Sequence, residues 1–152
     1  MKHTFAQFLI AAPASGSGKT TISIGMMAAL VRRGRVVQPF KCGPDYIDTK
    51  YHGMACHRSS YNFDLFMATD SHVKAIYSEA SRDADICVVE GMMGLFDGYD
   101  RDKGSAAAIA ELLDLPVVLV VDAKSAAYST AALISGFLHF RPTLRFAGVL
   151  FN

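Results

Sequence analysis

A segment rich in glycine and serine near the start of the sequence has the composition of a phosphate-binding loop. It runs from Ala12 to Thr21, between an apolar stretch and an apolar helical pattern. Glycines let backbone N–H groups turn toward phosphate oxygens, and the following helix adds the positive end of its dipole. In such a loop Lys19 reaches the β and γ phosphates, and the Thr20 hydroxyl coordinates Mg²⁺. The segment therefore predicts a nucleotide site whose loop residues are Ser15, Gly16, Ser17, Gly18, Lys19, Thr20 and Thr21.

This loop departs from the strict consensus at one position. Glycine is expected six residues before Lys19, and the sequence has Pro13 there. A flexible Gly/Ser linker that happens to contain Lys-Thr is the alternative interpretation. Because a linker would not lie between a buried strand and a buried helix, the sequence favours a variant phosphate loop.

Three carboxylates follow later apolar runs and are expected to converge on this loop. Asp45 and Asp48 come after one predicted strand, and Glu90 ends another. Ligands of open α/β sheets bind at the carboxyl ends of the strands. Since a nucleoside triphosphate is itself strongly negative, carboxylates beside it make sense only around Mg²⁺, directly or through its waters. The arrangement predicts a metal.

Lys41 adds a second cation near the γ phosphate, which is useful when the attacking group is itself an anion such as a carboxylate. The alternative for Asp45 and Asp48 is that they cap a turn begun by Gly43 and Pro44, because Asp is common in turns. Asp97 lies in a glycine-rich loop and carries a weaker signal.

Apolar runs alternate with helical patterns along the chain. We expect strands at 5–12, 36–40, 86–89, 117–121 and 146–151, and helices at 20–33, 69–82, 105–113 and from after Asp122 to about 140. The helix at 20–33 has so few polar positions that it should be packed on nearly all sides. The stretch 51–65 is expected to be loop with a short helix, and Tyr128 and the Phe residues of the last helix are expected in the core. This alternation predicts an α/β, doubly wound, mainly parallel sheet.

Composition indicates one domain with a sizeable core, since 51% of the 152 residues are hydrophobic and 19% are charged. A net charge of +1 without blocks of like charge argues against nucleic acid or an anionic membrane as a partner. The start of the chain imitates a signal peptide, but Gln7 interrupts its apolar core and cleavage there would destroy the phosphate loop. No apolar run approaches the roughly 20 residues of a membrane helix. We expect a soluble, cytoplasmic protein.

The cysteines and histidines suggest neither a disulfide framework nor a metal cluster. Cys42, Cys56 and Cys87 are odd in number and unevenly spaced, which suits a reducing compartment. His52, Cys56 and His57 lie close in sequence, but no second ligand pair follows at zinc spacing. We therefore expect these three residues to be structural.

Three motifs carry a resemblance to a known family. The segments 12–21, 40–48 and 90–98 closely resemble those of the amino-terminal, ATP-binding domain of the cobyrinic acid a,c-diamide synthase family. This likeness implies a P-loop fold similar to that of dethiobiotin synthetase, spanning 1–152 as one synthetase domain. Departures are small: Thr49 stands where the family usually has Pro, and Phe63 where it usually has Leu.

The resemblance implies a ligase that uses ATP to convert corrinoid carboxylates into amides through an acyl phosphate. In that family ammonia comes from glutamine, hydrolysed by a carboxyl-terminal glutaminase domain that is absent from this chain. The resemblance implies that Lys19 and Lys41 contact phosphate and that Thr20, Asp45 and Glu90 hold Mg²⁺. It implies that Asp48 and Asp97 support the metal, the phosphate or the acceptor. Tyr46 would face the corrin, and Asn152 would lie near adenine.

Two alternatives stay open. The same ATP site could serve another tetrapyrrole, such as hydrogenobyrinic acid or a nickel sirohydrochlorin. The domain could also be a nucleotide switch that forms a homodimer on ATP. Switches of the nearest type usually place a second Lys early in the loop, where this chain has Ala14, and they commonly carry a membrane or DNA surface.

Overall fold

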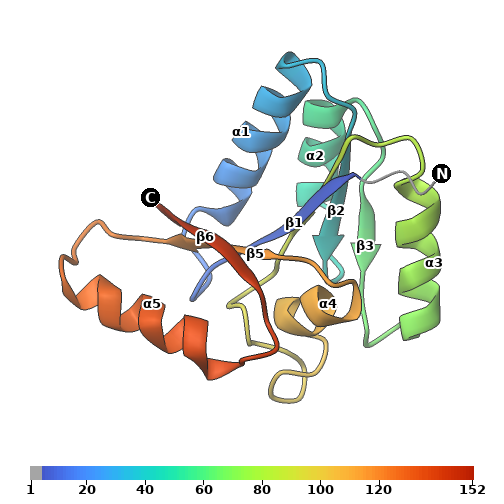
Figure 1. Ribbon diagram of the computed structural model, residues 1–152. Helices are drawn as coiled ribbons and strands as arrows, with labels where there is room; N and C mark the ends of the chain where they lie inside the picture. Colours follow the sequence, from blue (N-terminus) through green and yellow to red (C-terminus); the bar gives the residue numbers. More distant parts are fainter. Residues whose placement is uncertain (1–4) are drawn as a thin grey trace.

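A six-stranded parallel sheet organises the chain (Figure 1). The computed structural model describes residues 5–152; the first residues of the stretch compared above with a signal peptide, 1–4, lie outside them. The elements are β1 (Ala6–Ala11), α1 (Lys19–Arg32), β2 (Val37–Cys42), α2 (Asp48–Cys56), β3 (Tyr61–Phe63), α3 (Asp70–Ala80), β4 (Ile86–Glu90), α4 (Ala106–Leu112), β5 (Val117–Val121), α5 (Ser129–Phe140) and β6 (Phe146–Phe151). Their order in the sheet is β3-β2-β4-β1-β5-β6. The predicted doubly wound α/β fold is confirmed.

The helices cover both faces of the sheet. Met27 of α1 and Cys56 of α2 pack on one face, against a cluster that includes Ile10 and Val88. Side chains of α3, α4 and α5 pack on the other face, around a larger cluster that includes Phe40. Because successive residues of a strand point to opposite faces, the central strands are apolar without alternation, as a sheet covered on both sides requires.

An aromatic group anchors the larger cluster beside β2. The ring of Phe40 stacks on Phe63, with 4.7 Å between ring centroids, and lies 5.1 Å from the ring of Tyr77. Both phenylalanines are fully buried. These contacts join β2, β3 and α3, and so fix the strand that carries Lys41.

Several expected elements differ from the structure around β2 and α2. Strand β2 runs to Cys42, so Lys41 belongs to the strand and not to the loop after it. The stretch 51–65, expected to be loop with a short helix, contains the end of α2 and the short strand β3. The mixed sequence of β3 shows no strand pattern, because only Phe63 of its three residues is buried.

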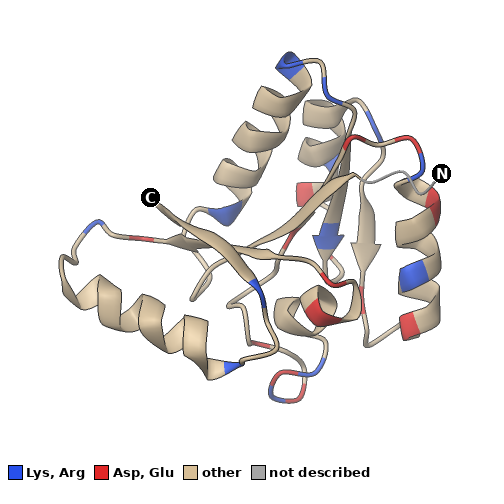
Figure 2. Ribbon diagram, viewed as in Figure 1, with Lys and Arg blue, Asp and Glu red and all other residues tan. Residues whose placement is uncertain are grey.

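The predictions for α1 and for the aromatic residues of the last helix were wrong in part. Helix α1 is buried at Lys19, Ser23 and Met27, and several of its other apolar side chains pack partly buried against the cluster that includes Met27. One stripe of the helix, at Thr21, Gly25, Ala29 and Arg32, is exposed, so the helix is not packed on all sides. Tyr128 is 92% exposed and Phe140 is 71% exposed, whereas Phe137 packs against the core. Figure 2 shows that α5 carries no charged residue along its length, although much of it is exposed.

Within the described chain, 5–152, no helix is long and apolar enough to cross a membrane. The three cysteines are buried and unpaired. Burial raises the pKa of Cys42 and of Cys56 to about 12, and it also raises the pKa of Cys87. These thiols are therefore protonated and unreactive near neutral pH.

The aromatic anchor gives a test of the core. Phe40→Ala should lower the free energy of unfolding by about 3–5 kcal/mol, because it leaves a cavity between Phe63 and Tyr77. Urea unfolding followed by circular dichroism measures this change. Tyr128→Ala removes an aromatic ring from an exposed position and should change the same quantity by no more than about 0.5 kcal/mol. Equal losses in the two variants would contradict the assigned core.

Candidate nucleotide site

The loop between β1 and α1 has the backbone shape that phosphate binding needs. Gly16 and Gly18 adopt φ angles of 80° and 88°, in the left-handed region that glycine enters without strain. The Ser17 hydroxyl donates to the carbonyl oxygen of Ala14 at 2.9 Å and closes the turn. Gly18 directly precedes α1, so the free N–H groups of the first helical turn face the loop.

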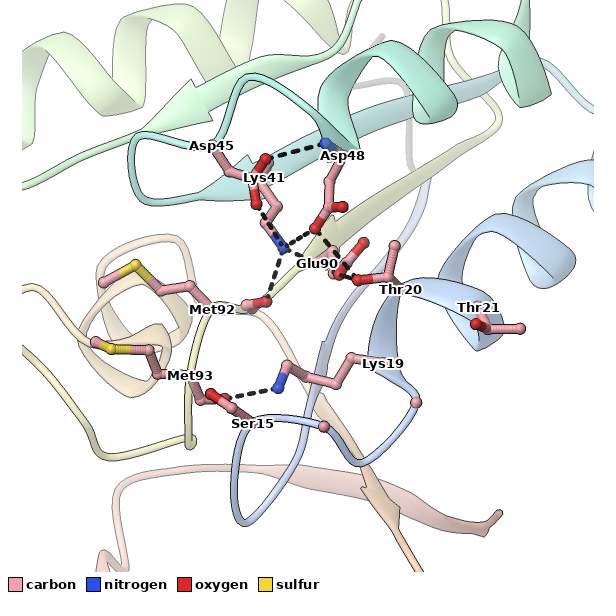
Figure 3. A pocket seen from close by; sticks show the side chains of 13 residues that line it. Ser15, Lys19, Thr20, Thr21, Lys41, Asp45, Asp48, Glu90, Met92 and Met93 are labelled. Atoms are coloured by element: carbon pink, nitrogen blue, oxygen red, sulfur yellow. Dashed lines mark hydrogen bonds and ion pairs between the residues drawn. The ribbon is translucent and has the colours of Figure 1, made fainter.

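A pocket of about 450 Å³ opens over this loop (Figure 3). It lies at the carboxyl ends of β1, β2 and β4, where a parallel sheet binds its ligands. Its lining includes the predicted residues Ser15, Gly16, Gly18, Lys19, Thr20, Thr21, Lys41, Asp45, Asp48 and Glu90. Residues distant in sequence thus meet at one site, as the motifs predicted.

Glu90 is the most deeply buried acid of the pocket, and its carboxylate is fully hydrogen-bonded. Oε1 accepts from the Thr20 hydroxyl at 2.7 Å and from Lys41 Nζ at 2.9 Å. Oε2 lies 2.7 Å from Nε2 of His52. Lys41 and Glu90 face each other in the register of β2 and β4. Figure 3 shows Thr20, Lys41 and Glu90 pointing toward one another from α1 and the two strands.

These contacts set the ionisation of Glu90 and Lys41. Burial acts to raise the pKa of Glu90, but the hydrogen bond to His52 and the charge of Lys41 outweigh it and hold that pKa below its ordinary value. Burial acts to lower the pKa of Lys41, but Glu90 and Asp48 outweigh it and raise that pKa. Both groups are therefore charged at neutral pH, as a buried ion pair requires.

Lys19 lies across the pocket from this pair. Its ammonium group donates to the carbonyl oxygen of Met93 at 2.7 Å and to that of Ala14 at 3.3 Å. Burial lowers the pKa of Lys19, and the nearby charge of Lys41 adds to the effect. Two ammonium groups near each other in one pocket are stabilised by an anion placed between them.

The two aspartates after β2 have different surroundings. Asp48 Oδ2 accepts from Lys41 Nζ at 2.7 Å and from the Thr20 hydroxyl at 3.2 Å. Asp45 Oδ1 instead accepts from the backbone N–H groups of Ile47 and Asp48, both at 2.9 Å, and caps the start of α2. Its other oxygen stays 3.9 Å from Lys41 Nζ. The turn-capping alternative therefore describes Asp45, while Asp48 contacts the central network.

Three further predicted residues lie around the pocket. Asp97 is not part of its lining; Oδ2 accepts from the N–H of Gly94 at 3.0 Å and braces the loop after β4. Asn152 lies beside the phosphate loop, where Nδ2 donates to the carbonyl oxygen of Ser17 at 3.2 Å. Tyr46 is 74% exposed and lines a neighbouring groove of about 450 Å³. That groove shares Asp45 and Met92 with the pocket.

His52 contacts the site through Glu90, a contact that the sequence did not predict. It lies on α2 four residues after Asp48, so both side chains project from one face of the helix. This spacing was the available signal, but the partner of His52 is Glu90, which is far away in sequence.

The donor set suits Mg²⁺. Among residues 5–152, no group of three or more His, Cys, Asp or Glu side chains is arranged to hold a metal ion by itself. Thr20, Asp48 and Glu90 instead offer one hydroxyl and two carboxylates within hydrogen-bonding distance of the hydroxyl. Mg²⁺ prefers such oxygen ligands and completes its shell with water and substrate phosphates. The residues present fit that ion.

Comparison with known proteins agrees with this geometry. Residues 8–152 match the family described as the CobQ/CobB/MinD/ParA nucleotide binding domain. The chain belongs to this family. It is 49% identical over 149 residues to "Cobyrinate a,c-diamide synthase" of Listeria innocua, and 50% identical over 146 residues to "Hydrogenobyrinate a,c-diamide synthase" of Brucella ovis. These alignments cover 96% and 95% of the chain.

The chain spans about a third of the length of these curated relatives, 33% and 34% respectively. Among solved structures, the signal recognition particle receptor FtsY from Elizabethkingia anophelis, a complex with GDP, superposes with a TM-score of 0.66 at 13% identity. That alignment covers 99% of this chain and 49% of the receptor. The similarity shows that the nucleotide binding domain shares the P-loop NTPase fold.

The lowered pKa of Glu90 predicts how acid affects the fold. Ionised Glu90 stabilises the folded chain above the ordinary carboxyl pKa of 4.5, and this contribution is lost as the pH falls through the lowered value. The loss of unfolding free energy caused by Glu90→Gln should therefore be larger at about pH 7 than at about pH 3.5. Urea unfolding in EDTA measures it.

The control for this experiment is Glu79→Gln, which changes an exposed ion pair between Glu79, near the end of α3, and Arg82, which follows the helix. It should alter the free energy of unfolding by no more than about 1 kcal/mol at either pH. If the Glu90→Gln difference did not depend on pH, the buried ion pair would not have the assigned ionisation.

Proposed function

We propose that this chain is the ATP-using part of a ligase that amidates the a and c carboxylates of cobyrinic acid in cobalamin biosynthesis. One observation carries the proposal: two lysine ammonium groups, those of Lys19 and Lys41, line one phosphate-loop pocket. When only a nucleotide is bound, the loop lysine alone commonly contacts its β and γ phosphates. A second cation is useful when an anionic carboxylate must approach an anionic phosphate. The curated relatives named as a,c-diamide synthases support the same conclusion.

The proposed chemistry has two steps. A carboxylate oxygen of the corrinoid attacks the γ phosphorus of ATP, forms an acyl phosphate and releases ADP. Ammonia then attacks the acyl carbon, and inorganic phosphate leaves as the amide forms and a proton is lost. Lys19 and Lys41 neutralise the charge on the transferred group, because preorganised cations stabilise such a transition state.

Thr20, Asp48 and Glu90 are the residues that would hold Mg²⁺, directly or through its waters, with Asp45 at the rim. When bound, this ion neutralises the charge of the β and γ phosphates. Asn152 and Ser17 lie on the side of the loop proposed for the rest of the nucleotide.

The groove at Tyr46 is the proposed place of the tetrapyrrole. Tyr46 and Ile47 are exposed there, and Met92 joins this apolar surface to the nucleotide pocket. A large, flat acceptor could thus lie on apolar side chains while its acetate reaches Lys41. Asp97 is proposed to act indirectly, by bracing the loop that carries Met92.

Ammonia is proposed to come from glutamine, hydrolysed by a glutaminase domain elsewhere in the full-length protein, in the cytoplasm. Two observations support an ammonia source outside this chain. The chain spans about a third of its curated relatives. Its own three thiols are buried with raised pKa values, and a glutaminase needs a reactive cysteine.

Hydrogenobyrinic acid is the second candidate acceptor, because the relative from Brucella ovis is named for it and is as similar as the first. In the deciding experiment, the chain is incubated with Mg-ATP, free ammonia and one of the two acceptors. The corrinoid products are identified by mass spectrometry, and ADP release is measured in parallel. Amide formation matched by ADP is the expected result, and the acceptor that is amidated identifies the substrate. ADP without amide would contradict both proposed acceptors and favour either a nucleotide switch that dimerises or a different acceptor.

Lys19→Ala tests the phosphate contact. The variant should lose about 10²-fold or more in ATP turnover, because backbone N–H groups alone do not replace the missing charge. Lys124→Ala removes an exposed lysine after β5 and should leave turnover unchanged. If Lys19→Ala bound and hydrolysed ATP as the parent does, the assignment of this segment as the phosphate-binding loop would be contradicted.

A further inference from the structure

His52 is fully buried, which is unusual for a histidine without a specific partner. Both ring nitrogens have one: Nε2 lies 2.7 Å from Glu90 Oε2, and Nδ1 lies 3.2 Å from the Ser60 hydroxyl oxygen. The ring therefore connects the segment before β3 to the carboxylate at the end of β4.

The direction of the contact with Glu90 follows from the acceptor. An ionised carboxylate only accepts hydrogen bonds, so Nε2 of His52 carries the hydrogen and donates it. Because Thr20 and Lys41 both donate to the other oxygen, Oε1, the donors to Glu90 come from two opposite sides. The carboxylate cannot rotate about its last bond without breaking these contacts.

We propose that His52 is a positioning residue that holds Glu90 Oε1 toward the nucleotide pocket for metal binding. The proposal rests on the proposed function only in so far as both place Mg²⁺ and a nucleotide in this pocket. Hydrogen bonds from behind a ligand commonly fix its orientation, and their loss costs about 10- to 100-fold in metal affinity or activity.

The geometry of α2 supports this role. Asp48 and His52 are one turn apart, and Asp48 contacts Lys41 and Thr20 while His52 contacts Glu90. Asp45 caps the start of the same helix. One short helix thus places an acid on one side of the pocket and orients the acid on the other.

Two amide variants separate positioning from simple filling of space. In His52→Gln the amide nitrogen stands as many bonds from the backbone as Nε2, so it reaches Glu90. In His52→Asn the amide nitrogen corresponds to Nδ1, so it reaches Ser60 but not Glu90. The measurement is the dissociation constant of ADP for the 152-residue chain by calorimetry, once with Mg²⁺ and once in EDTA.

The quantity compared is the Mg²⁺ effect, the factor by which Mg²⁺ lowers the dissociation constant of ADP relative to EDTA. We expect this factor to be about 10- to 100-fold smaller in His52→Asn than in the parent, and close to the parent value in His52→Gln. ADP binding in EDTA should match the parent in both variants, because Lys19 and the loop contact the phosphates. Adding His52→Asn to Glu90→Gln should cause no further loss of the Mg²⁺ effect, since His52 acts only through the Glu90 carboxylate, which Glu90→Gln already removes.

A Mg²⁺ effect in His52→Asn equal to that of the parent would overturn the proposal. Equal losses in the Asn and Gln variants, or a parent in which Mg²⁺ does not change ADP binding, would overturn it as well. If His52→Asn does not fold, Ser60→Ala replaces it and must weaken the Mg²⁺ effect; an unchanged value would again overturn the proposal. Amide formation does not enter this measurement, so failure of the ligase assay and failure of the positioning role remain distinct.

Discussion

The buried carboxylate of Glu90 is the group on which the rest of the site depends. A charge removed from water must be compensated by close, well-aligned partners, or the folded state loses several kcal/mol. Glu90 obtains these partners from three other elements: Lys41 from β2, Thr20 from α1 and His52 from α2. Each element can dock in only one way if all of these contacts form. The hydrogen bonds that the Glu90 carboxylate requires thus fix the relative positions of the phosphate loop, strand β2 and helix α2.

The same network determines which ligands the pocket accepts. Its charged side chains are two lysines and three carboxylates, so the carboxylates outnumber the ammonium groups. A polyphosphate entering alone would meet Asp48 and Glu90 at short range. Lys41 already lies between these two acids, 2.7 Å and 2.9 Å from their oxygens. Under the proposed function, a divalent cation bound with the phosphates would compensate the acids, and Lys41 would then be free to interact with phosphate. The geometry therefore links the proposed metal to the proposed second phosphate contact.

Sequence patterns predicted most of the residues that line the pocket, because these residues lie at strand ends. Lys19 and Thr20 follow a buried strand, and Glu90 ends another, so a parallel sheet brings them together. The patterns could not separate Asp45 from Asp48, because only the path of the chain into α2 decides which carboxylate caps the helix. The contact of His52 could not be predicted for a similar reason, since its partner Glu90 lies 38 residues away in the sequence. The wrong expectation for Tyr128 has another cause: an aromatic residue beside an apolar helix carries no signal for which face is covered.

Under the proposed function, the ATP chemistry and the choice of acceptor lie on separate parts of the chain. The charged network is built from α1, β2, α2 and β4, where each residue has several partners and a change would disturb the fold. The proposed acceptor groove is formed mainly by the loop ahead of α2, where Tyr46 and Ile47 are exposed. Substitutions at Tyr46 or Ile47 would then alter the preference for an acceptor without disturbing the network. Under the proposed function, this separation explains how relatives named for two different corrinoids can be equally similar to the chain.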